Sequence, residues 1–249
     1  MELEILNEKH YGLRAQGEIK MTGKLYGIGV GPGDPELLTL KAVRLIKECD
    51  KIVVPGEDHK TSVAYKIALE AVPELAQKEV RGIAMPMTKD KDILEENYEA
   101  AAAVITGWLD EGKDVGILNL GDVTVYSTCL YIHKLVKAAG YHTELVNGIP
   151  SFCAVAARLD MGLVERSQQL HVLPASYQIE EGLKLPGTKV LMKSGKQIGK
   201  VKKLIKEMGM NAVMIENCGM EEEKIYRTTD EIDENAGYYS LMIVKEQEE

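Results

Sequence analysis

The chain has 249 residues, of which 45% are hydrophobic and 28% charged, and its formal net charge is −9. This length and composition fit a globular protein with one large or two modest domains. No apolar run approaches the roughly 18 residues that a membrane span needs, and the lack of a basic stripe argues against nucleic acid as a partner.

Most of the negative charge lies near the end of the chain. Residues 216–249 account for −8 of the net charge of −9, so residues 1–215 are close to neutral. We expect this acidic stretch to form a solvated face of the protein.

The cysteines and the N-terminus indicate in which cell compartment the protein resides. The four cysteines show no C-x-x-C pairing, and the first residues lack a hydrophobic signal segment. We therefore expect free thiols, packed in the interior, in a cytoplasmic protein.

The first part of the chain predicts an extension followed by an α/β domain. Residues 1–20 are polar and without periodicity, and domain boundaries are expected at 21–148 and 149–249. Repeated β-α-β spacing predicts a mostly parallel sheet with right-handed crossovers. Strands are expected at 25–30, 52–54, 79–84, 114–120 and 142–146, and helices from Pro35 and at 61–71, 90–111 and 124–139.

The second domain is expected to be a mixed α/β unit. A helix at 196–208 would turn Ile198, Val201, Ile205 and Met208 inward. The last two strands have no helix of useful length between them, so we expect them to pair with each other in antiparallel fashion. The expected strands are 170–173, 189–192, 211–216, 224–228 and 238–244.

The first strand runs into a loop that is almost free of side chains, Gly27-Ile28-Gly29-Val30-Gly31-Pro32-Gly33-Asp34. Asp34 followed by Pro35 predicts a helix start, with an N-cap acceptor and a proline at the first helical position. The dinucleotide fingerprint Gly-x-Gly-x-x-Gly fails here, because its third glycine would fall on Asp34 or on Pro32.

Two further strands end in the same way. Gly121-Asp122 follows the strand at 114–120, and Asn147-Gly148 follows the strand at 142–146. The carboxyl ends of parallel strands are where open α/β sheets bind ligands. The sequence therefore predicts a ligand site built from these three turns.

With these motifs, the chain resembles the tetrapyrrole (corrin and porphyrin) methyltransferases over about residues 23–245. Within that family it is most similar to the enzymes that methylate C20 of precorrin-2 or cobalt-precorrin-2. Asn147 departs from the family pattern, which usually has proline there. The resemblance is carried by residues 31–42, Pro86-Met87-Thr88, residues 121–128, residues 216–220 and Tyr239-Ser240.

The resemblance implies two α/β domains with a ligand cleft between them, and S-adenosylmethionine as the methyl donor. It further implies a homodimer, a tetrapyrrole substrate, and no metal bound by the protein. The cofactor contacts that it implies are Pro32, Gly121, Asp122, Val123, Ser127, Thr128, Pro150, Ser151, Met192 and Cys218.

The precorrin-2 substrate that the resemblance implies carries eight carboxylates, and burying them requires cations or clustered backbone donors. We expect at least one of Lys89, Lys91 and Arg158 to pair with a substrate carboxylate. No residue is assigned as the base that removes the C20 proton, although Tyr126 and Glu57 are weak candidates.

Several alternatives stay open at this point. Asp122 could only cap a helix starting near Thr124, and Met192 could be ordinary strand core. The chain could methylate another ring position, or carry a tetrapyrrole without methylating it. A Rossmann-type dehydrogenase would use Glu57 or Asp58 as its ribose-binding acid.

Overall fold

The computed structural model describes residues 11–13, 19–85, 88, 90–175 and 179–246. These described residues form two compact units, one with those up to residue 31 and from 35 to 149, and one with residues 32–34 and those from 150 onward. Each unit has its own sheet and its own hydrophobic core.

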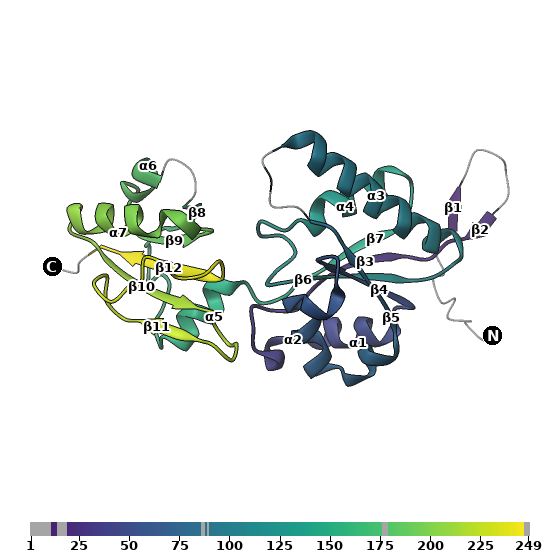
Figure 1. Cartoon of the computed structure of the whole chain (residues 1–249), viewed down its shortest axis with the longest axis horizontal. Helices are drawn as coiled ribbons and strands as arrows, with labels where there is room; N and C mark the ends of the chain where they lie inside the picture. Colours follow the sequence, from purple (N-terminus) through teal and green to yellow (C-terminus); the bar gives the residue numbers. More distant parts are fainter. Residues whose placement is uncertain (1–10, 14–18, 86–87, 89, 176–178, 247–249) are drawn as a thin grey trace. The chain divides into compact units, whose positions relative to one another are not determined.

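The first unit is built on a five-stranded sheet of order β5-β4-β6-β3-β7, in which every neighbouring pair is parallel (Figure 1). The predicted parallel sheet is thus confirmed. Its strands are β3 (Leu25–Gly29), β4 (Lys51–Pro55), β5 (Glu79–Ile83), β6 (Val115–Asn119) and β7 (Thr143–Val146).

Helices cover both faces of this sheet (Figure 1). Ile28 and Ile52 lie in the core beneath α1 (Leu40–Glu48) and α2 (Val63–Ala71). Val53 and Ile117 lie in the core beneath α3 (Lys91–Asp110) and α4 (Cys129–Ala138). Because both faces are covered, the central strands β4 and β6 are mostly apolar and buried, whereas the edge strands β5 and β7 carry polar residues. Three short 3-10 helices, η1 (Pro35–Leu37), η2 (His59–Thr61) and η3 (Pro73–Gln77), lie between these elements.

Two helices begin later than predicted. Pro35 starts only the 3-10 turn η1, and α1 begins at Leu40, where the Thr39 Oγ1 accepts a hydrogen bond from the Ala42 N–H at 3.1 Å. Asp34 is therefore not the N-cap of α1. The helix predicted at 124–139 begins at Cys129, because Tyr126 has a φ of 49° and interrupts the helical path.

The predicted extension contains two short strands in its described part. β1 (Tyr11–Leu13) pairs antiparallel with β2 (Ile19–Met21). Each of these strands has three residues. So short a strand gives no periodic pattern, and the sequence therefore did not predict them.

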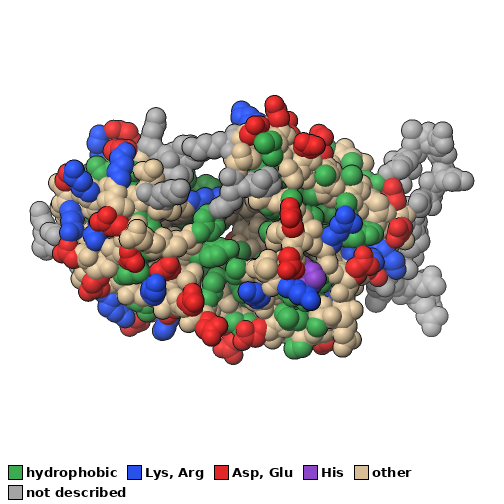
Figure 2. All heavy atoms as spheres, in the orientation of Figure 1, with side chains coloured by type: hydrophobic (Ala, Val, Ile, Leu, Met, Phe, Trp, Pro, Cys, Tyr) green, Lys and Arg blue, Asp and Glu red, His purple; other side chains and the backbone are tan. Residues whose placement is uncertain are grey.

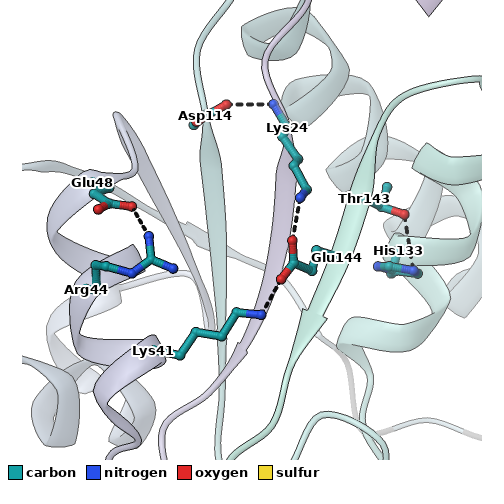
Figure 3. A network of polar contacts seen from close by, with 8 residues as sticks. All are labelled: Lys24, Lys41, Arg44, Glu48, Asp114, His133, Thr143 and Glu144. Atoms are coloured by element: carbon teal, nitrogen blue, oxygen red, sulfur yellow. Dashed lines mark hydrogen bonds and ion pairs between the residues drawn. The ribbon is translucent and has the colours of Figure 1, made fainter. Parts of the chain in front are cut away.

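A charged network secures the amino-terminal edge of the first sheet (Figure 3). The Lys24 N–H donates to Asp114 Oδ1 at 2.7 Å, and the Lys24 ammonium pairs with Glu144 of β7. Lys41 of α1 approaches the other Glu144 oxygen at 2.5 Å. Hydrogen bonds from these two lysines lower the pKa of Glu144. The network links the starts of three strands to α1, at the edge opposite the glycine turns.

The second unit contains a mixed sheet of order β11-β10-β12-β9-β8, in which only β8 and β9 are parallel. α6 (Ile179–Leu183) and α7 (Ile198–Glu207) pack on one face, and α5 (Ser151–Arg158) packs on the other. Ile198, Val201 and Ile205 are fully buried, as predicted. The strands are β8 (Leu170–Pro174), β9 (Thr188–Met192), β10 (Asn211–Glu216), β11 (Lys224–Tyr226) and β12 (Ser240–Lys245), with the 3-10 helix η4 (Gly195–Gln197) before α7.

The predicted pairing of the last two strands is wrong. β11 and β12 do not pair with each other; both pair with β10, which lies between them. The connection between β11 and β12 crosses β10, and no local pattern in the sequence reveals that crossing.

Acidic and basic side chains are interspersed over the visible face of the second unit (Figure 2). Glu216 departs from the expected solvated face, because it is 7% exposed and accepts a hydrogen bond from the Gly237 N–H at 2.6 Å. The four cysteines are free, but Cys153 is exposed and Cys218 half-buried, so only Cys49 and Cys129 fit the predicted interior packing. Among the described helices, none combines the length and apolar character of a membrane span.

Candidate functional site

Three glycine turns meet at the carboxyl edge of the first sheet. They follow β6, β3 and β7, which are neighbours in the sheet. Gly31 and Gly121 exchange two backbone hydrogen bonds, with N···O distances of 3.3 and 2.7 Å. A Cβ on Gly29 would lie 2.5 Å from the Gly148 nitrogen, so only glycine allows these backbones to approach so closely. The structure therefore brings together the three turns that the sequence singles out.

Gly121 leaves room beside this junction. Its φ is +73°, and a Cβ there would meet only the Ile149 oxygen, at 4.0 Å. Its backbone is thus bent by the turn, while the space that a side chain would occupy holds no protein atom in close contact. The main chain of this turn is therefore accessible from that side.

Asp122 fastens two of the turns together. Its Oδ1 accepts a hydrogen bond from the Thr124 N–H at 2.7 Å and another from the Thr124 hydroxyl. Its Oδ2 accepts from Asn147 Nδ2 at 3.1 Å and from the Gly148 N–H at 3.0 Å. The carboxylate therefore joins the turn after β6 to the turn after β7.

These contacts determine the charge of Asp122. Burial would raise the pKa of its carboxyl, but the hydrogen bonds from Thr124, Asn147 and Gly148 outweigh burial and lower the pKa. The group is an anion at neutral pH with four donors of its own chain. Asp122 does more than cap a helix near Thr124, since α4 begins at Cys129.

Asn119 and Ser127 hold the remainder of the loop after β6. The Ser127 hydroxyl donates to Asn119 Oδ1 at 2.5 Å, and Asn119 Nδ2 donates to the Leu120 and Asp122 carbonyls at 2.8 and 3.2 Å. Both side chains are buried. Val123, between the two, is fully buried, and Thr128 is the N-cap residue of α4.

The second unit contains its own close backbone contact. A Cβ on Gly33 would lie 2.1 Å from the Cys218 carbonyl oxygen, and a Cβ on Gly219 would lie 2.7 Å from the Asp34 nitrogen. Gly33 and Asp34, which directly follow Pro32, thus pack on the turn that follows β10.

Glu223 fixes this second turn. One of its oxygens accepts from the Gly219 N–H at 2.9 Å, and the other accepts from Arg158 Nε at 2.8 Å. Burial, reinforced by Glu223, raises the pKa of the Cys218 thiol to about 11. Cys218 is therefore a neutral thiol at physiological pH and not a thiolate nucleophile.

The other predicted contact residues of this unit lie at element ends. Pro150 and Ser151 begin α5, and Met192 ends β9. Met192 is half-buried against the core between the sheet and α5, and its carbonyl accepts from the Ala175 N–H at 2.8 Å.

The three expected substrate anchors differ in their surroundings. Lys89 lies outside the described residues. Lys91 is the exposed first residue of α3. Arg158 ends α5 and is paired with Glu223, which offsets its charge.

Asn119, Asn147 and Glu223 were not assigned a site role from the sequence. The partners of Asn147 and Glu223 are distant along the chain: Asp122 lies 25 positions before Asn147, and Arg158 lies 65 positions before Glu223. The position of Asn119 at a strand end, directly before the Leu120-Gly121 turn, was the one local signal available. Within the described ranges, no group of three or more His, Cys, Asp or Glu side chains is placed to hold a metal ion.

The strand order defines the class of fold. Numbered one to five along the chain, the strands of the first sheet lie in the order 3-2-4-1-5, whereas a Rossmann sheet begins 3-2-1-4-5. The first unit is therefore a parallel α/β sheet with glycine turns at its ligand edge, but not a Rossmann fold. This topology and the failed fingerprint count against the dehydrogenase alternative.

The chain belongs to the family of tetrapyrrole (corrin/porphyrin) methylases, whose profile matches residues 24–232. The protein is thus a methyltransferase. It is 38% identical over 231 residues to a probable cobalt-precorrin-2 C(20)-methyltransferase of Methanocaldococcus jannaschii, with 91% of this chain and 97% of that protein covered. It is 31% identical to the cobalt-precorrin-2 C(20)-methyltransferase of Salmonella typhimurium, with 91% and 98% covered.

Solved structures share the fold. The cobalt precorrin-4 methyltransferase matches with a TM-score of 0.69 at 22% identity, covering 90% of this chain and 94% of that one. A uroporphyrin-III C-methyltransferase from Thermus thermophilus, complexed with S-adenosyl homocysteine, matches with a TM-score of 0.68 at 20% identity, covering 90% and 98%.

Proposed function

We propose that the protein transfers the methyl group of S-adenosylmethionine to C20 of cobalt-precorrin-2 or precorrin-2, in cobalamin biosynthesis. The observation that carries this proposal is the similarity, along nearly the whole chain, to relatives named for that reaction. A relative named precorrin-2 C(20)-methyltransferase, from a Sinorhizobium species, is 27% identical with 89% of this chain covered.

The glycine turns fit the donor. The amino-acid end of S-adenosylmethionine needs polar backbone groups at close range, and the turn at Gly121 offers backbone with room beside it. We assign the donor to the turn residues Pro32, Gly121, Asp122, Val123, Ser127 and Thr128, together with Pro150, Ser151, Met192 and Cys218. In this assignment Asp122 and Ser127 act by holding the loop, because their side chains are engaged within it.

For methyl transfer, the main task of the protein is to align the methyl donor with the ring carbon. S-adenosylmethionine supplies an activated methyl group, and the nucleophile is the electron-rich ring carbon. Holding both reactants in line is worth about 7–11 kcal/mol in ideal cases. The hydrogen-bonded turns provide such rigidity, and the proposal assigns no metal to the protein.

A different ring position is the less favoured alternative. A cobalt-precorrin-4 C(11)-methyltransferase of Priestia megaterium is 26% identical, but only 56% of this chain is covered. The similarity to proteins named for C20 is both higher and more complete.

For the substrate carboxylates, Lys91 is the stronger of the two described anchor candidates. It is exposed at the start of α3, whereas Arg158 is paired with Glu223. The role of Lys89 as a substrate anchor stays a prediction from the sequence. Neutralising the anchor should raise the KM for the tetrapyrrole in a salt-dependent manner. A cytoplasmic location, supported by the four free cysteines, and a homodimer, supported by the family resemblance alone, are part of the same proposal.

The donor assignment is tested by Gly121→Val with S-adenosylhomocysteine as the calorimetric ligand. The added side chain would fill the space beside the turn, so binding should be lost while circular dichroism stays native. Gly140→Val is the matched control, because Gly140 also has a positive φ, of +91°, and open space around it, but lies between α4 and β7 at the opposite edge. Equal affinity in the two variants would remove this turn from the site.

A further inference from the structure

Glu223 is a mostly buried acid with both of its carboxylate oxygens engaged. Its side chain is 14% exposed. One oxygen accepts from the Gly219 N–H at 2.9 Å, and the other accepts from Arg158 Nε at 2.8 Å. The two preceding acids, Glu221 and Glu222, are exposed. Of these three consecutive carboxylates, Glu223 is therefore the one withdrawn from water, and its two partners compensate for the lost hydration.

The turn that Glu223 holds has an irregular backbone. Asn217 and Gly219, on the two sides of Cys218, have left-handed φ values of 55° and 74°. Such a conformation at a non-glycine residue persists when the surrounding structure supports it. The Asn217 N–H donates to the Tyr239 carbonyl at 3.0 Å, and the Gly219 N–H donates to Glu223. The turn is thus fastened on both sides of Cys218, and Glu223 is the side chain that fastens the Gly219 end.

The position of this turn is coupled to the glycine loop after β3. A Cβ on Gly33 would lie 2.1 Å from the Cys218 carbonyl oxygen, and a Cβ on Gly219 would lie 2.7 Å from the Asp34 nitrogen. Backbones packed this closely cannot shift independently of each other. Pro32, directly before Gly33, and Cys218 are both assigned to the donor. The contacts that fix this turn therefore also support two donor residues.

The ion pair between Glu223 and Arg158 lies close to the Cys218 thiol. Burial is the largest cause of the raised pKa of this thiol; Glu223 raises the pKa further, and Arg158 lowers it. Both charges thus act on the same side chain, with opposite effects. The carboxylate is beside Cys218 as well as bound to the residue that follows it.

We propose that Glu223 is a positioning residue for the methyl donor. Through the Gly219 N–H, it holds Cys218 and the adjoining backbone of Gly33 and Asp34 in the geometry that S-adenosylmethionine binding requires. Glu223 is assigned no contact with the donor itself, because its two oxygens are bound within the chain. This inference rests on the proposed function for the identity of the donor and for the place of Cys218 in its site.

Three variants test the hydrogen bond to Gly219. Glu223→Ala removes it, and the calorimetric Kd for S-adenosylhomocysteine should rise about tenfold, because the Gly219 N–H loses its charged acceptor. Glu223→Gln keeps an oxygen for that N–H, so its Kd should stay within about threefold of wild type. Glu221→Ala is the matched control, because it removes the same charge from the same run of acids at an exposed position. Its Kd should equal that of wild type.

A purely structural role of Glu223 would give a different pattern. A loss of stability alone would lower the Tm and the fraction of active protein, and hence kcat, but it would leave the KM for S-adenosylmethionine unchanged. The proposal predicts that this KM rises in Glu223→Ala together with the Kd. A Kd in Glu223→Ala equal to that of wild type would overturn the proposal. So would an equal loss of affinity in Glu223→Gln, which would assign the effect to the charge that faces Arg158.

Glu223→Asp takes the place of Glu223→Ala if the alanine variant lacks native circular dichroism. Aspartate keeps the charge but is one methylene too short to span Gly219 and Arg158 at the observed distances. Its Kd for S-adenosylhomocysteine should be about threefold or more above that of wild type. The same Kd in the two proteins would count against Glu223 as a positioning residue.

Failure of the proposed function would appear in the wild type itself. A wild type that binds S-adenosylhomocysteine but methylates neither macrocycle contradicts the proposed reaction, and the comparison of Kd values still decides the role of Glu223. A wild type that binds no S-adenosylhomocysteine contradicts the assigned donor, and the inference about Glu223 is then wrong as well.

Discussion

Buried polar side chains determine the shape of the site at the residue scale. Asp122 is 5% exposed and receives hydrogen bonds from Thr124, Asn147 and Gly148. The side chain of Asn147 reaches Asp122, and this hydrogen bond fastens the turn after β7 to the turn after β6.

Asp122→Ala should therefore weaken both the fold and donor binding. Removing the carboxylate leaves the Gly148 N–H without this acceptor, and a loss of about 1–3 kcal/mol in the free energy of unfolding is expected. The affinity for S-adenosylhomocysteine should fall in parallel. Asp122→Asn keeps an acceptor oxygen and should lose less of both. Unchanged affinity in Asp122→Ala, by calorimetry, would show that the two turns hold their positions without Asp122.

His133 gives the protein a pH-dependent stability. The ring is 8% exposed, with Nε2 3.3 Å from the Thr143 hydroxyl (Figure 3) and Nδ1 buried without a hydrogen-bond partner in the described structure. Burial, together with Lys137, lowers the pKa of His133. The unfolded chain therefore binds the proton more readily than the folded one.

The lowered pKa of His133 determines how the stability of the fold changes with pH. Stability from neutral His133 is present above the unfolded pKa of about 6.5 and is lost as the pH falls below it. The Tm should thus decline more steeply between pH 7 and pH 5 in wild type than in His133→Gln. Parallel Tm profiles for the two proteins would rule out this contribution.

At the scale of elements, the contact between residues 32–34 and the turn after β10 depends on glycine. Gly33→Ala would place a Cβ 2.1 Å from the Cys218 oxygen, so a loss of about 1–3 kcal/mol in stability is expected. Gly107→Ala in α3 meets no atom within 4 Å and should stabilise by about 0.5–1 kcal/mol. Chemical denaturation measures both changes. Gly33→Ala unfolding at the same denaturant concentration as Gly107→Ala would contradict the close packing.

The elements also show what local sequence can predict. Apolar strand runs and glycine turns located the parallel sheet and its ligand edge, because these signals are local. The start of α4 was missed because Tyr126 adopts a left-handed conformation, which its residue type does not favour. The predicted pairing of β11 with β12 was wrong because β10 lies between those strands, an order that no local pattern reveals.

Among the site residues, too, those with a local sequence signal could be predicted and those that depend on distant contacts could not. Gly121 was identified from its place after a strand, and the structure places it beside Gly31. The engagement of Asp122 with Asn147, 25 positions away, and of Arg158 with Glu223, 65 positions away, could not be predicted. Such pairs arise only when the chain has folded.

At the scale of the whole molecule, both units carry residues assigned to the donor, and the family match extends over both. The central claim is methyl transfer to one carbon of the macrocycle. The most direct test incubates the protein with S-adenosylmethionine labelled with carbon-13 in its methyl group, and with cobalt-precorrin-2 or precorrin-2 in parallel. Mass spectrometry counts the methyl groups transferred, and NMR locates the labelled carbon.

The account predicts one labelled methyl group at C20 and one equivalent of S-adenosylhomocysteine per product, with at least one of the two macrocycles. A label at another ring carbon, or no transfer to either macrocycle by a protein that binds S-adenosylhomocysteine, would contradict it.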